Sequence, residues 1–537
     1  MTQTKLSAND EQNNQPEQGI TRISVSGYKS LAEECSIEIA PLTILSGANS
    51  SGKSSIMQPL LLMKQTLEST YDAGSLKLNG ANVRLTSTDQ IFTKGGKKSL
   101  NSNNSFSVSI ELSSNKVLKN IFQKQNKFKG IKILSSIYNY KSISVIISLG
   151  MTHEDLLNSF PRYLQNSYFS LAEEYKMEWE DFNIEYDELQ KFKFVPSPSL
   201  KQRIIGIEER YLDLPEEILL ISQGNDSLKK HYADTYKEAY IKSRNERIEK
   251  QYKFSVMSYR CFLYINAPFI ASLDTPIDLN STEELFFFFS DSGLSKSIEK
   301  SLRQLIHVPG LRGNPERTYP IASISGEFSG TFENYVASII HHWKVSKDKR
   351  LKLLGEALQI LGLTWKVDTK QIDDTQVEVR VGRLKNKGNS QSTDMVSIAD
   401  VGFGLSQTLP VVVALLVAEP EQLVYLEQPE IHLHPRAQAN LAQLLIDAAN
   451  RGVRVVVETH SELLIRRVQS LIAEDKIAAE KVKLHWFSQD DNGFTKVTTA
   501  ELDETGAFGD WPEDFSEISL QEESRYLDAA ESKLMAV

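Results

Sequence analysis

The segment GANSSGKS, residues 47–54, has the residue types and spacing of a loop that binds nucleotide phosphates. It satisfies the pattern G-x-x-x-x-G-K-[ST], follows an apolar strand-like segment and precedes a helical one, as the pattern requires. Gly47 and Gly52 allow backbone angles at which the N–H groups of the loop converge on phosphate oxygens. Lys53 is predicted to reach the β and γ phosphates of a nucleotide, and Ser54 to offer its hydroxyl to Mg²⁺, although the pattern alone does not choose among kinases, GTPases and ATPases. The other predicted contacts of the loop are Asn49, Ser50, Ser51 and Ser55.

A second glycine-containing segment, DVGFGLSQ, begins at Asp400 and precedes an apolar helix. A helix start of this kind favours contact with a phosphate group. It carries no lysine, and a loop of this kind is suited to contact the γ phosphate held by a second copy of the chain. A tight turn with glycines placed for backbone reasons is the alternative interpretation.

An acidic strand and a histidine follow the second glycine segment. LVYLEQPEIHLHP, residues 423–435, places Glu427 at the carboxyl end of a strand, where ligands of open parallel sheets gather. A carboxylate at this position can hold Mg²⁺ through water, so Ser54 and Glu427 form the predicted metal site. VRVVVETHSE then places His460 at the tip of another buried strand, where it can contact a γ phosphate.

The residue after Glu427 is Gln428, an amide that cannot accept a proton from an attacking water. Gln428 can still orient that water, as a glutamine does in some GTPases. Glu430 and Glu458 are the two alternative proton acceptors, and their spacing does not choose between them. We therefore predict an ATPase with slow hydrolysis, whose more important output is ATP-driven dimerisation.

The fold predicted around these motifs is α/β, with a parallel sheet core. Segments of alternating and continuous apolar residues predict strands, and amphipathic segments between them predict helices of the length that connects parallel strands. The predicted strands include residues 42–46, 422–427, 453–459 and 481–488, and the predicted helices 53–70, 404–418, 436–449 and 461–473.

The nucleotide-binding head is split in the sequence by a large inserted lobe, which is mixed at first and then mainly helical. The predicted parts are a disordered arm, the first part of the head, the inserted lobe, the second part of the head and a C-terminal tail. Their expected bounds are 1–18, 19–110, 111–330, 331–505 and 506–537.

The composition indicates a soluble globular protein without a membrane span. The chain has 537 residues, 40% of them apolar and 24% charged, with a net charge of −10. A negative balance does not favour nucleic-acid binding outside a local basic patch. The longest apolar run, residues 409–418, is shorter than the roughly 20 residues that cross lipid. The polar N-terminus lacks a signal peptide, and only Cys35 and Cys261 are present, so we expect a cytoplasmic protein.

These motifs together resemble ATPases of the ABC class. The resemblance rests on SGYKS, LTILSGANSSGKSS, the glycine segment from Asp400, EQPEIHLHP and ETHSE, and it is closest to the soluble branch that includes chromosome-maintenance and overcoming-lysogenisation-defect (OLD) proteins. It implies that Lys53 and Ser54 bind phosphate and Mg²⁺, that Glu427 is the acid beside the metal and that His460 is a switch. It also implies that Gly402, Gly404 and Ser406 contact the nucleotide held by the partner copy. The glycine segment departs from the usual serine-glycine-glycine run. Two further residues are expected at the nucleotide: Gln90, as a glutamine-loop residue, and Lys29.

Within that branch the chain resembles the PtuA-type ATPases of Septu and retron-associated anti-phage systems. HVPGLRGNPERTY at 307–319 and GAFGDWPEDFSE near the C-terminus carry this narrower resemblance. It implies a regulatory ATPase that forms a dimer or larger homo-oligomer around ATP and controls an HNH nuclease. In retron systems it also implies a reverse transcriptase and its DNA as partners. In HVPGLRGNPERTY itself, a shaped turn around Arg312 and Arg317 is the first interpretation, and contact with nucleotide or a partner is the second.

Two other functions are weighed against this one. A self-contained nuclease of the OLD kind needs a further domain, and the 77 residues after His460 supply only the last strands of the head and a tail. A DNA-repair clamp related to chromosome-maintenance proteins needs a basic surface. Residues 115–132 hold six lysines with Phe122 and Phe128 between them, which suits phosphates and base stacking, although a solvated hairpin is the simpler interpretation.

Overall fold

The computed structural model describes residues 19–94, 104–113, 116–125, 130–166, 255–266, 293–324, 326–383, 394–509 and 524–529. The predicted N-terminal arm, most of the predicted helical part of the inserted lobe and most of the C-terminal tail lie outside these residues. The chain divides into two compact units. The larger comprises Met1–Leu149, Ser258–Leu263 and Leu294–Val537, and the smaller comprises Gly150–Met257 and Tyr264–Gly293.

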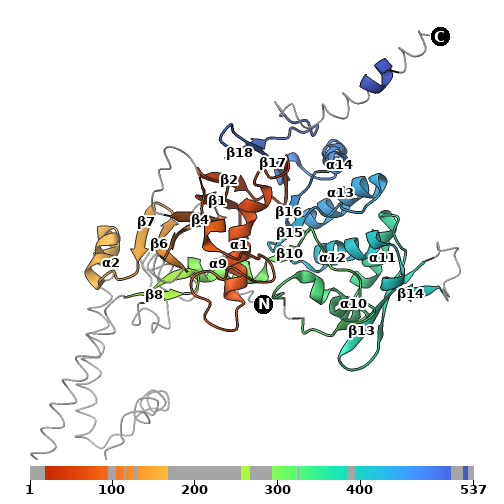
Figure 1. Cartoon of the computed structure of the whole chain (residues 1–537), viewed down its shortest axis with the longest axis horizontal. Helices are drawn as coiled ribbons and strands as arrows, with labels where there is room; N and C mark the ends of the chain where they lie inside the picture. The colour runs from red at the N-terminus through yellow and green to blue at the C-terminus, as the bar shows by residue number, and fades with distance from the viewer. Residues whose placement is uncertain are drawn as a thin grey trace, which may run out of the picture. The chain divides into compact units, whose positions relative to one another are not determined.

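A six-stranded sheet forms the centre of the larger unit (Figure 1). Five of its strands are parallel, and the last pairs antiparallel with its neighbour. Most residues of the parallel strands are buried, and more than half are apolar, as expected for strands covered on both faces. Their order across the sheet is β10 (Ile306–Val308), β15 (Leu423–Glu427), β16 (Arg454–Glu458), β3 (Leu42–Gly47), β17 (Val482–Gln489) and β18 (Thr495–Ala500).

Helices connect and cover these strands, so the predicted α/β class is confirmed. α1 contacts both β3 and β1 (Arg22–Ser26) and packs on α9, whereas α13 packs on β3, β16 and α14. In Figure 1, α1 and α9 lie to one side of the labels β15 and β16, and α12 to α14 lie to the other. The helices are α1 (Lys53–Leu67), α9 (Leu294–Gln304), α12 (Phe403–Val417), α13 (Pro435–Asn450) and α14 (Glu462–Ala473).

A second six-stranded sheet is antiparallel and lies in the same unit. Its order is β2 (Cys35–Glu38), β1, β4 (Ser105–Ser113), β5 (Lys116–Lys124), β6 (Ile131–Tyr140) and β7 (Ile143–Ser148). Since β1 pairs with β4, this sheet carries the N-terminal strands past residue 111, where the sequence predicted the inserted lobe to begin. The chain leaves the larger unit after Leu149.

The remaining described elements are smaller. A four-stranded sheet contains β11 (Tyr319–Pro320), β13 (Gln376–Gly382) and β12 (Val367–Gln371), with β14 (Met395–Ser397) paired to β13. α10 (Val336–Val345) and α11 (Arg350–Ile360) pack beside it. β8 (Ser255–Tyr259) pairs with β9 (Phe262–Asn266), and α2 (His153–Ser159) belongs to the smaller unit. In the described part of the chain, no helix combines the length and the apolar character that a membrane crossing needs.

Candidate functional site

The glycine loop at 47–54 joins the end of β3 to the start of α1. Gly47 has φ 139°, and a Cβ there would lie 2.1 Å from the carbonyl oxygen of Phe487 on β17. Gly52 has φ 102°, and a Cβ there would lie 2.3 Å from the hydroxyl oxygen of Thr495. Both positions therefore require glycine, for backbone conformation and for space. The loop predicted from the sequence has the strand, turn and helix that phosphate binding needs.

Lys53 points back into this loop. Its ammonium group donates hydrogen bonds to the carbonyls of Gly47 at 3.0 Å and Ala48 at 2.7 Å. Burial lowers the pKa of Lys53, and the nearby Glu458 carboxylate opposes that change. The Lys53 ammonium is thus held against the backbone of the loop. In the nucleotide complex, phosphate oxygens would replace the two carbonyl oxygens as its partners.

The other loop residues lie as a cradle would place them. Asn49 and Ser50 are exposed at its tip, and Ser50 has φ 63°. Ser51 is buried, and its hydroxyl has no hydrogen-bond partner within the described chain. The Ser55 N–H donates to the Gly52 carbonyl at 2.9 Å, in the first turn of α1.

Ser54 meets Glu458, at the end of β16, rather than Glu427. The Ser54 hydroxyl donates to one oxygen of Glu458 at 2.9 Å, and the Tyr425 hydroxyl donates to the other at 2.9 Å. Burial raises the pKa of Glu458 above its ordinary value, and the nearby Glu427 carboxylate adds to the rise. β16 lies between β3 and β15, so the acid nearest the loop comes from the strand that also leads to His460.

Glu427 ends β15 and is held from the other side. One of its oxygens lies 3.2 Å from His307 Nε2, and the other accepts the N–H of Gly310 at 3.1 Å. Burial opposes ionisation of Glu427, but the hydrogen bonds with His307 and Gly310 hold its pKa below the ordinary value. Sequence reasoning missed both partners, because the segment at 307–319 was predicted as a turn, whereas its first two residues belong to strand β10.

The acids fit a divalent cation with few protein ligands. Glu427 and Glu458 are register partners on adjacent parallel strands, and the charge of the first disfavours ionisation of the second. A divalent cation placed beside Ser54 would relieve that repulsion. Within the described residues, no cluster of three or more His, Cys, Asp or Glu side chains is arranged to hold a metal. Mg²⁺ commonly takes one or two carboxylates together with phosphate and water, so the set present suits it.

Gln428 follows in a left-handed conformation, with φ 42°. Its N–H donates to the carbonyl of Glu458 at 2.7 Å, which ties the acid loop to β16. The non-glycine residue in this conformation makes a sharp turn directly after Glu427.

Glu430 is buried and holds the tip of β16. One carboxylate oxygen accepts the Thr459 hydroxyl at 2.7 Å and the His460 N–H at 3.0 Å. Its other oxygen is buried and has no hydrogen-bond partner in the described chain. The His460 ring lies at the surface of the site, and its partial burial, together with the charge of Lys53, lowers its pKa.

The second glycine segment forms the start of α12 and faces outward. Gly402 precedes the helix and is exposed, while a Cβ at Gly404 would lie 3.0 Å from the His432 carbonyl oxygen. The Ser406 hydroxyl donates to the carbonyl of Phe403, whose exposed ring packs edge-on against His432. In the parts of the chain that the structure describes, no hydrogen bond joins these residues to the loop at 47–54.

Gln90 and Lys29, the two other residues predicted at the nucleotide, lie close together, but only Lys29 contacts α1. The side chain of Gln90 accepts the N–H groups of Thr86 at 2.8 Å and Ser87 at 3.3 Å, so it closes its own exposed turn. The Lys29 ammonium donates to the side chain of Gln58 on α1 at 2.5 Å, and the Lys29 N–H donates to Ile91 next to Gln90. Gln58 was not anticipated, and its place one turn after Ser54 is the signal that could have found it.

The lysine-rich stretch contradicts the idea of base stacking by Phe122. That ring is fully buried and stacks on Phe106 at 5.1 Å between centroids. Lys119 and Lys124 form ion pairs with Glu34 and Asp89, at 2.6 and 2.5 Å. Residues 126–129, which include Phe128, lie outside the described residues.

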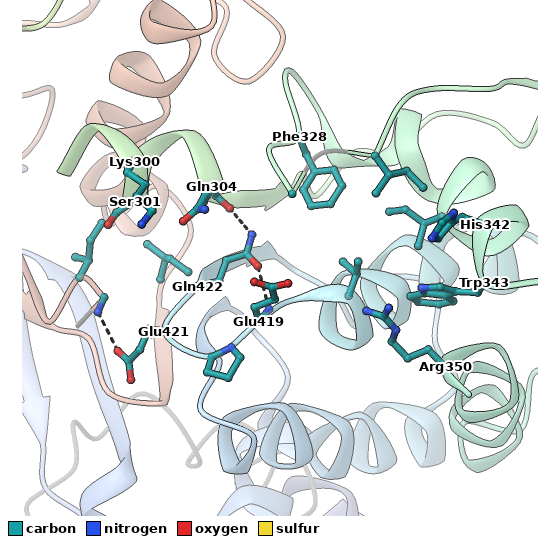
Figure 2. Close-up of a pocket in the computed structure, with 18 residues that line it drawn as sticks. Lys300, Ser301, Gln304, Phe328, His342, Trp343, Arg350, Glu419, Glu421 and Gln422 are labelled. Atoms are coloured by element: carbon teal, nitrogen blue, oxygen red, sulfur yellow. Dashed lines mark hydrogen bonds between the residues drawn. The ribbon is translucent and has the colours of Figure 1, made fainter. Parts of the chain in front are cut away.

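A separate cavity of about 460 Å³ lies at the opposite edge of the parallel sheet, where β15 begins. Figure 2 shows Trp343 and Arg350 on one side of it, Lys300 and Glu421 on the other, and Glu419 between them. Glu421 accepts the Gly19 N–H at 2.9 Å. This cavity is distant along the strands from every residue of the phosphate loop, since parallel strands begin at one edge and end at the other.

Comparison with protein-family models matches residues 19–465 to a family described as AAA ATPase domain. Comparison with curated proteins finds no match. Among solved structures, the Smc head domain of Pyrococcus furiosus, with an extended coiled coil and bound to the C-terminal domain of ScpA, is 13% identical. That match covers 90% of this chain and 96% of the other, with a TM-score of 0.38. The SMC head domain from Thermotoga maritima is 8% identical over 90% of this chain and 100% of its own, with a TM-score of 0.31.

Proposed function

Since the chain belongs to the AAA ATPase domain family and is thus a P-loop ATPase, we propose that it binds MgATP between two copies of itself and hydrolyses it slowly. The observation that carries this proposal is the meeting of Lys53, Ser54 and Glu458 beneath one glycine loop. An ammonium, a hydroxyl and a carboxylate at a helix N-terminus are the groups that bind a triphosphate and its cation.

Each group has a distinct task in this proposal. Lys53 and the loop N–H groups bind the β and γ phosphates, and Ser54 with Glu427 and Glu458 holds the cation. Mg²⁺, when bound, neutralises charge that develops on the phosphate oxygens. Gln428 orients the attacking water.

The proton acceptor best supported is Glu430. Both oxygens of Glu458 accept hydrogen bonds from hydroxyl groups, whereas Glu430 keeps one buried oxygen without a partner in the described chain. Glu430 also fixes the backbone of His460, which we propose as the γ-phosphate sensor. Phosphoryl transfer depends mainly on positioning and electrostatics. A general base at residue 430 instead of residue 428 is therefore expected to slow turnover without abolishing it.

Dimerisation follows from the outward-facing start of α12. Gly402, Gly404 and Ser406 lie in the first turn of α12 or just before it, where the chain is exposed or half-buried, and this supports their proposed contact with the γ phosphate of a second copy. This arrangement and the resemblance of the motifs support assignment of the chain to the ABC class.

The biological role we propose is regulation of an HNH nuclease in anti-phage defence, in some systems with a reverse transcriptase and its DNA. The support is the resemblance of residues 307–319 and of the C-terminal GAFGDWPEDFSE to PtuA-type ATPases. A DNA clamp is less favoured, because the Phe122 side chain that it would use is inside a sheet.

The first test is equilibrium ATP binding and sedimentation of the wild type, Lys53→Ala and the control Lys352→Ala, whose side chain is 85% exposed. We expect Lys53→Ala to lose ATP binding and ATP-dependent pairing, while the control keeps both. Wild-type turnover should lie well below about 100 per second, within the usual enzyme range. ATP-dependent pairing of Lys53→Ala at the wild-type level would contradict the proposal.

The second test is co-expression with an HNH nuclease subunit followed by a DNA cleavage assay. We expect cleavage to depend on the nuclease and to respond to ATP. Cleavage by this chain alone would favour a self-contained nuclease instead.

A further inference from the structure

The segment His307–Gly313, here called the coupling segment, contacts both the acid strand and the α12 helix. We infer that its Arg312 is a positioning residue that links the outward-facing start of α12 to Glu427, and so makes hydrolysis in one copy depend on ATP in the other. This inference rests on the proposed function, and it adds a route between the two sites that the motifs do not contain.

The first half of the coupling segment holds the acid. His307 and Gly310 contact the two different oxygens of Glu427, so the orientation of that carboxylate is set by this segment. His307 is 2% exposed and stacks on Tyr425, with ring centroids 5.4 Å apart and planes within 11°. Its other ring nitrogen lies 3.0 Å from Asn82 Oδ1. The ring therefore has little freedom to move unless the strand beside it moves.

The second half of the segment holds the helix. Arg312 Nη1 donates to the Gln407 carbonyl on α12 at 3.0 Å, and Arg312 Nη2 donates to the Glu427 carbonyl at 3.1 Å. The Gln407 side chain donates in return to the Gly313 carbonyl at 3.0 Å. One planar guanidinium thus joins the helix that follows the glycine segment to the backbone of the acid.

The cost of burying Arg312 argues against a merely structural contact. Arg312 is 8% exposed, and burial lowers its pKa despite the attraction of Glu333, Glu430 and Glu427. Its Nε and one oxygen of Glu333 are buried without hydrogen-bond partners among the described residues. An apolar side chain usually fills such a position at lower cost than a buried charge. A planar donor that bridges two carbonyls is what a lysine or an aliphatic residue cannot replace.

A weaker contact strengthens the same connection. Arg317 forms an exposed, two-pronged ion pair with Asp400, at 2.8 and 3.2 Å, two residues before Gly402. Exposed ion pairs contribute little to stability, so Arg312 is the main link.

The functional consequence is cooperativity. When the start of α12 engages ATP held by the partner copy, any shift of Gln407 moves the guanidinium and with it the backbone of Glu427. The metal acid is then correctly placed only when the opposite site is filled. The Hill coefficient for ATP hydrolysis should therefore approach roughly 2, its limit for two coupled sites.

The test is steady-state hydrolysis against ATP concentration, with binding of a fluorescent ATP analogue and thermal melting measured on the same full-length proteins. The variants are Arg312→Lys, Arg312→Met and Gln407→Met, and the matched control is Arg466→Lys on the exposed side of α14. We expect Arg312→Lys to bind the analogue within about twofold of wild type, to lose about tenfold in kcat and to show a Hill coefficient near 1, since coupling of this size is typical. Gln407→Met should lie between this variant and wild type.

Three outcomes would overturn the inference. If both Arg312 variants keep the wild-type Hill coefficient, Arg312 does not couple the two ATP sites. Non-cooperative hydrolysis by the wild type removes the dependence between sites while leaving the proposed ATPase intact. Parallel loss of binding, turnover and melting temperature in Arg312→Lys and Gln407→Met assigns these residues to folding. A wild type that neither binds nor hydrolyses ATP contradicts the proposed function itself.

Discussion

The two edges of the parallel sheet differ in how their polar groups are satisfied. At the amino edge, Glu421 accepts hydrogen bonds from the Gly19 N–H and from Arg454, and Arg454 also reaches the Ile39 carbonyl at 2.9 Å. Gln422 donates to Gln304 at 2.6 Å beside the cavity in Figure 2. These groups form pairs within the chain, although Gly19, Gln304, Glu421 and Gln422 line a cavity of about 460 Å³.

At the carboxyl edge, several buried polar atoms lack a partner in the described chain: Ser51 Oγ, Arg312 Nε and one oxygen each of Glu333 and Glu430. Buried polar groups are normally hydrogen-bonded, and exceptions at one place indicate water, an ion or a ligand. The cavity at the amino edge is therefore a weaker candidate for a ligand than the carboxyl edge. Size alone does not identify the site; incomplete hydrogen bonding does.

The largest expected effect concerns Glu430, at the carboxyl edge, where the hydrogen bonding is incomplete. Glu430→Gln should reduce kcat by about 100-fold or more, the usual contribution of a general base, with ATP binding retained. The measurement is single-turnover hydrolysis, and Glu421→Gln at the amino edge is the matched control. Equal turnover in Glu430→Gln and wild type would transfer the base role elsewhere.

The next effect concerns Arg454, at the amino edge, where the polar groups are paired within the chain. Arg454→Met should lower the free energy of unfolding by about 2 kcal/mol, because it leaves Glu421 partly buried with fewer donors. ATP turnover per folded molecule should not change. Chemical denaturation gives the first quantity and hydrolysis assays the second. A fall in turnover without a fall in stability would show that the two edges communicate.

A smaller effect concerns the cation. Glu427→Gln should raise the Mg²⁺ concentration for half-maximal hydrolysis by about tenfold, as expected when a group that orients a metal or its water is lost. ATP binding without Mg²⁺ should stay the same. Should Glu458→Gln alone change the Mg²⁺ requirement, Glu458 rather than Glu427 would be the metal acid.

The smallest effect is a pH dependence of stability at Glu458. Because burial raises its folded pKa above the ordinary 4.5, its contribution to stability is complete below that pH and is lost as pH rises through the folded pKa. Glu458→Gln should therefore gain stability relative to wild type as pH increases from 4.5 towards neutrality. Thermal melting across that range checks the sign, with Glu356→Gln on the exposed face of α11 as the control. A constant difference between Glu458→Gln and wild type would contradict the raised pKa.

Local patterns predicted the elements and the phosphate loop well. β3, α1, α12, β15, α13, β16 and α14 lie within a few residues of their expected bounds, because apolar periodicity and glycine spacing act over short stretches. The burial of Phe122 was also available from the alternation of Leu118, Asn120 and Phe122 along β5. The neighbouring lysines favoured the interpretation that Phe122 is exposed and able to stack on bases.

The contacts that assemble the site could not be predicted in this way. The contact of Ser54 with Glu458 depends on β16 lying between β3 and β15, and strand order does not follow from periodicity. The link from Arg312 to Gln407 joins positions 95 residues apart. The feature that distinguishes this segment from a surface turn is a buried arginine that bridges two carbonyls. A sequence pattern does not reveal either the burial or the bridge.

Strand β16 has a consequence for how the chain tolerates insertions. Its last residue, Glu458, contacts Ser54, and the two residues that follow it place Thr459 against Glu430 and His460 at the surface of the site. Side chains alternate along a strand, so a slip of one position would turn every one of these groups to the wrong face. An added or deleted residue in the turn between α13 and β16 should therefore inactivate the protein even where its fold survives, and the spacing there is expected to be invariant in length while its side chains vary.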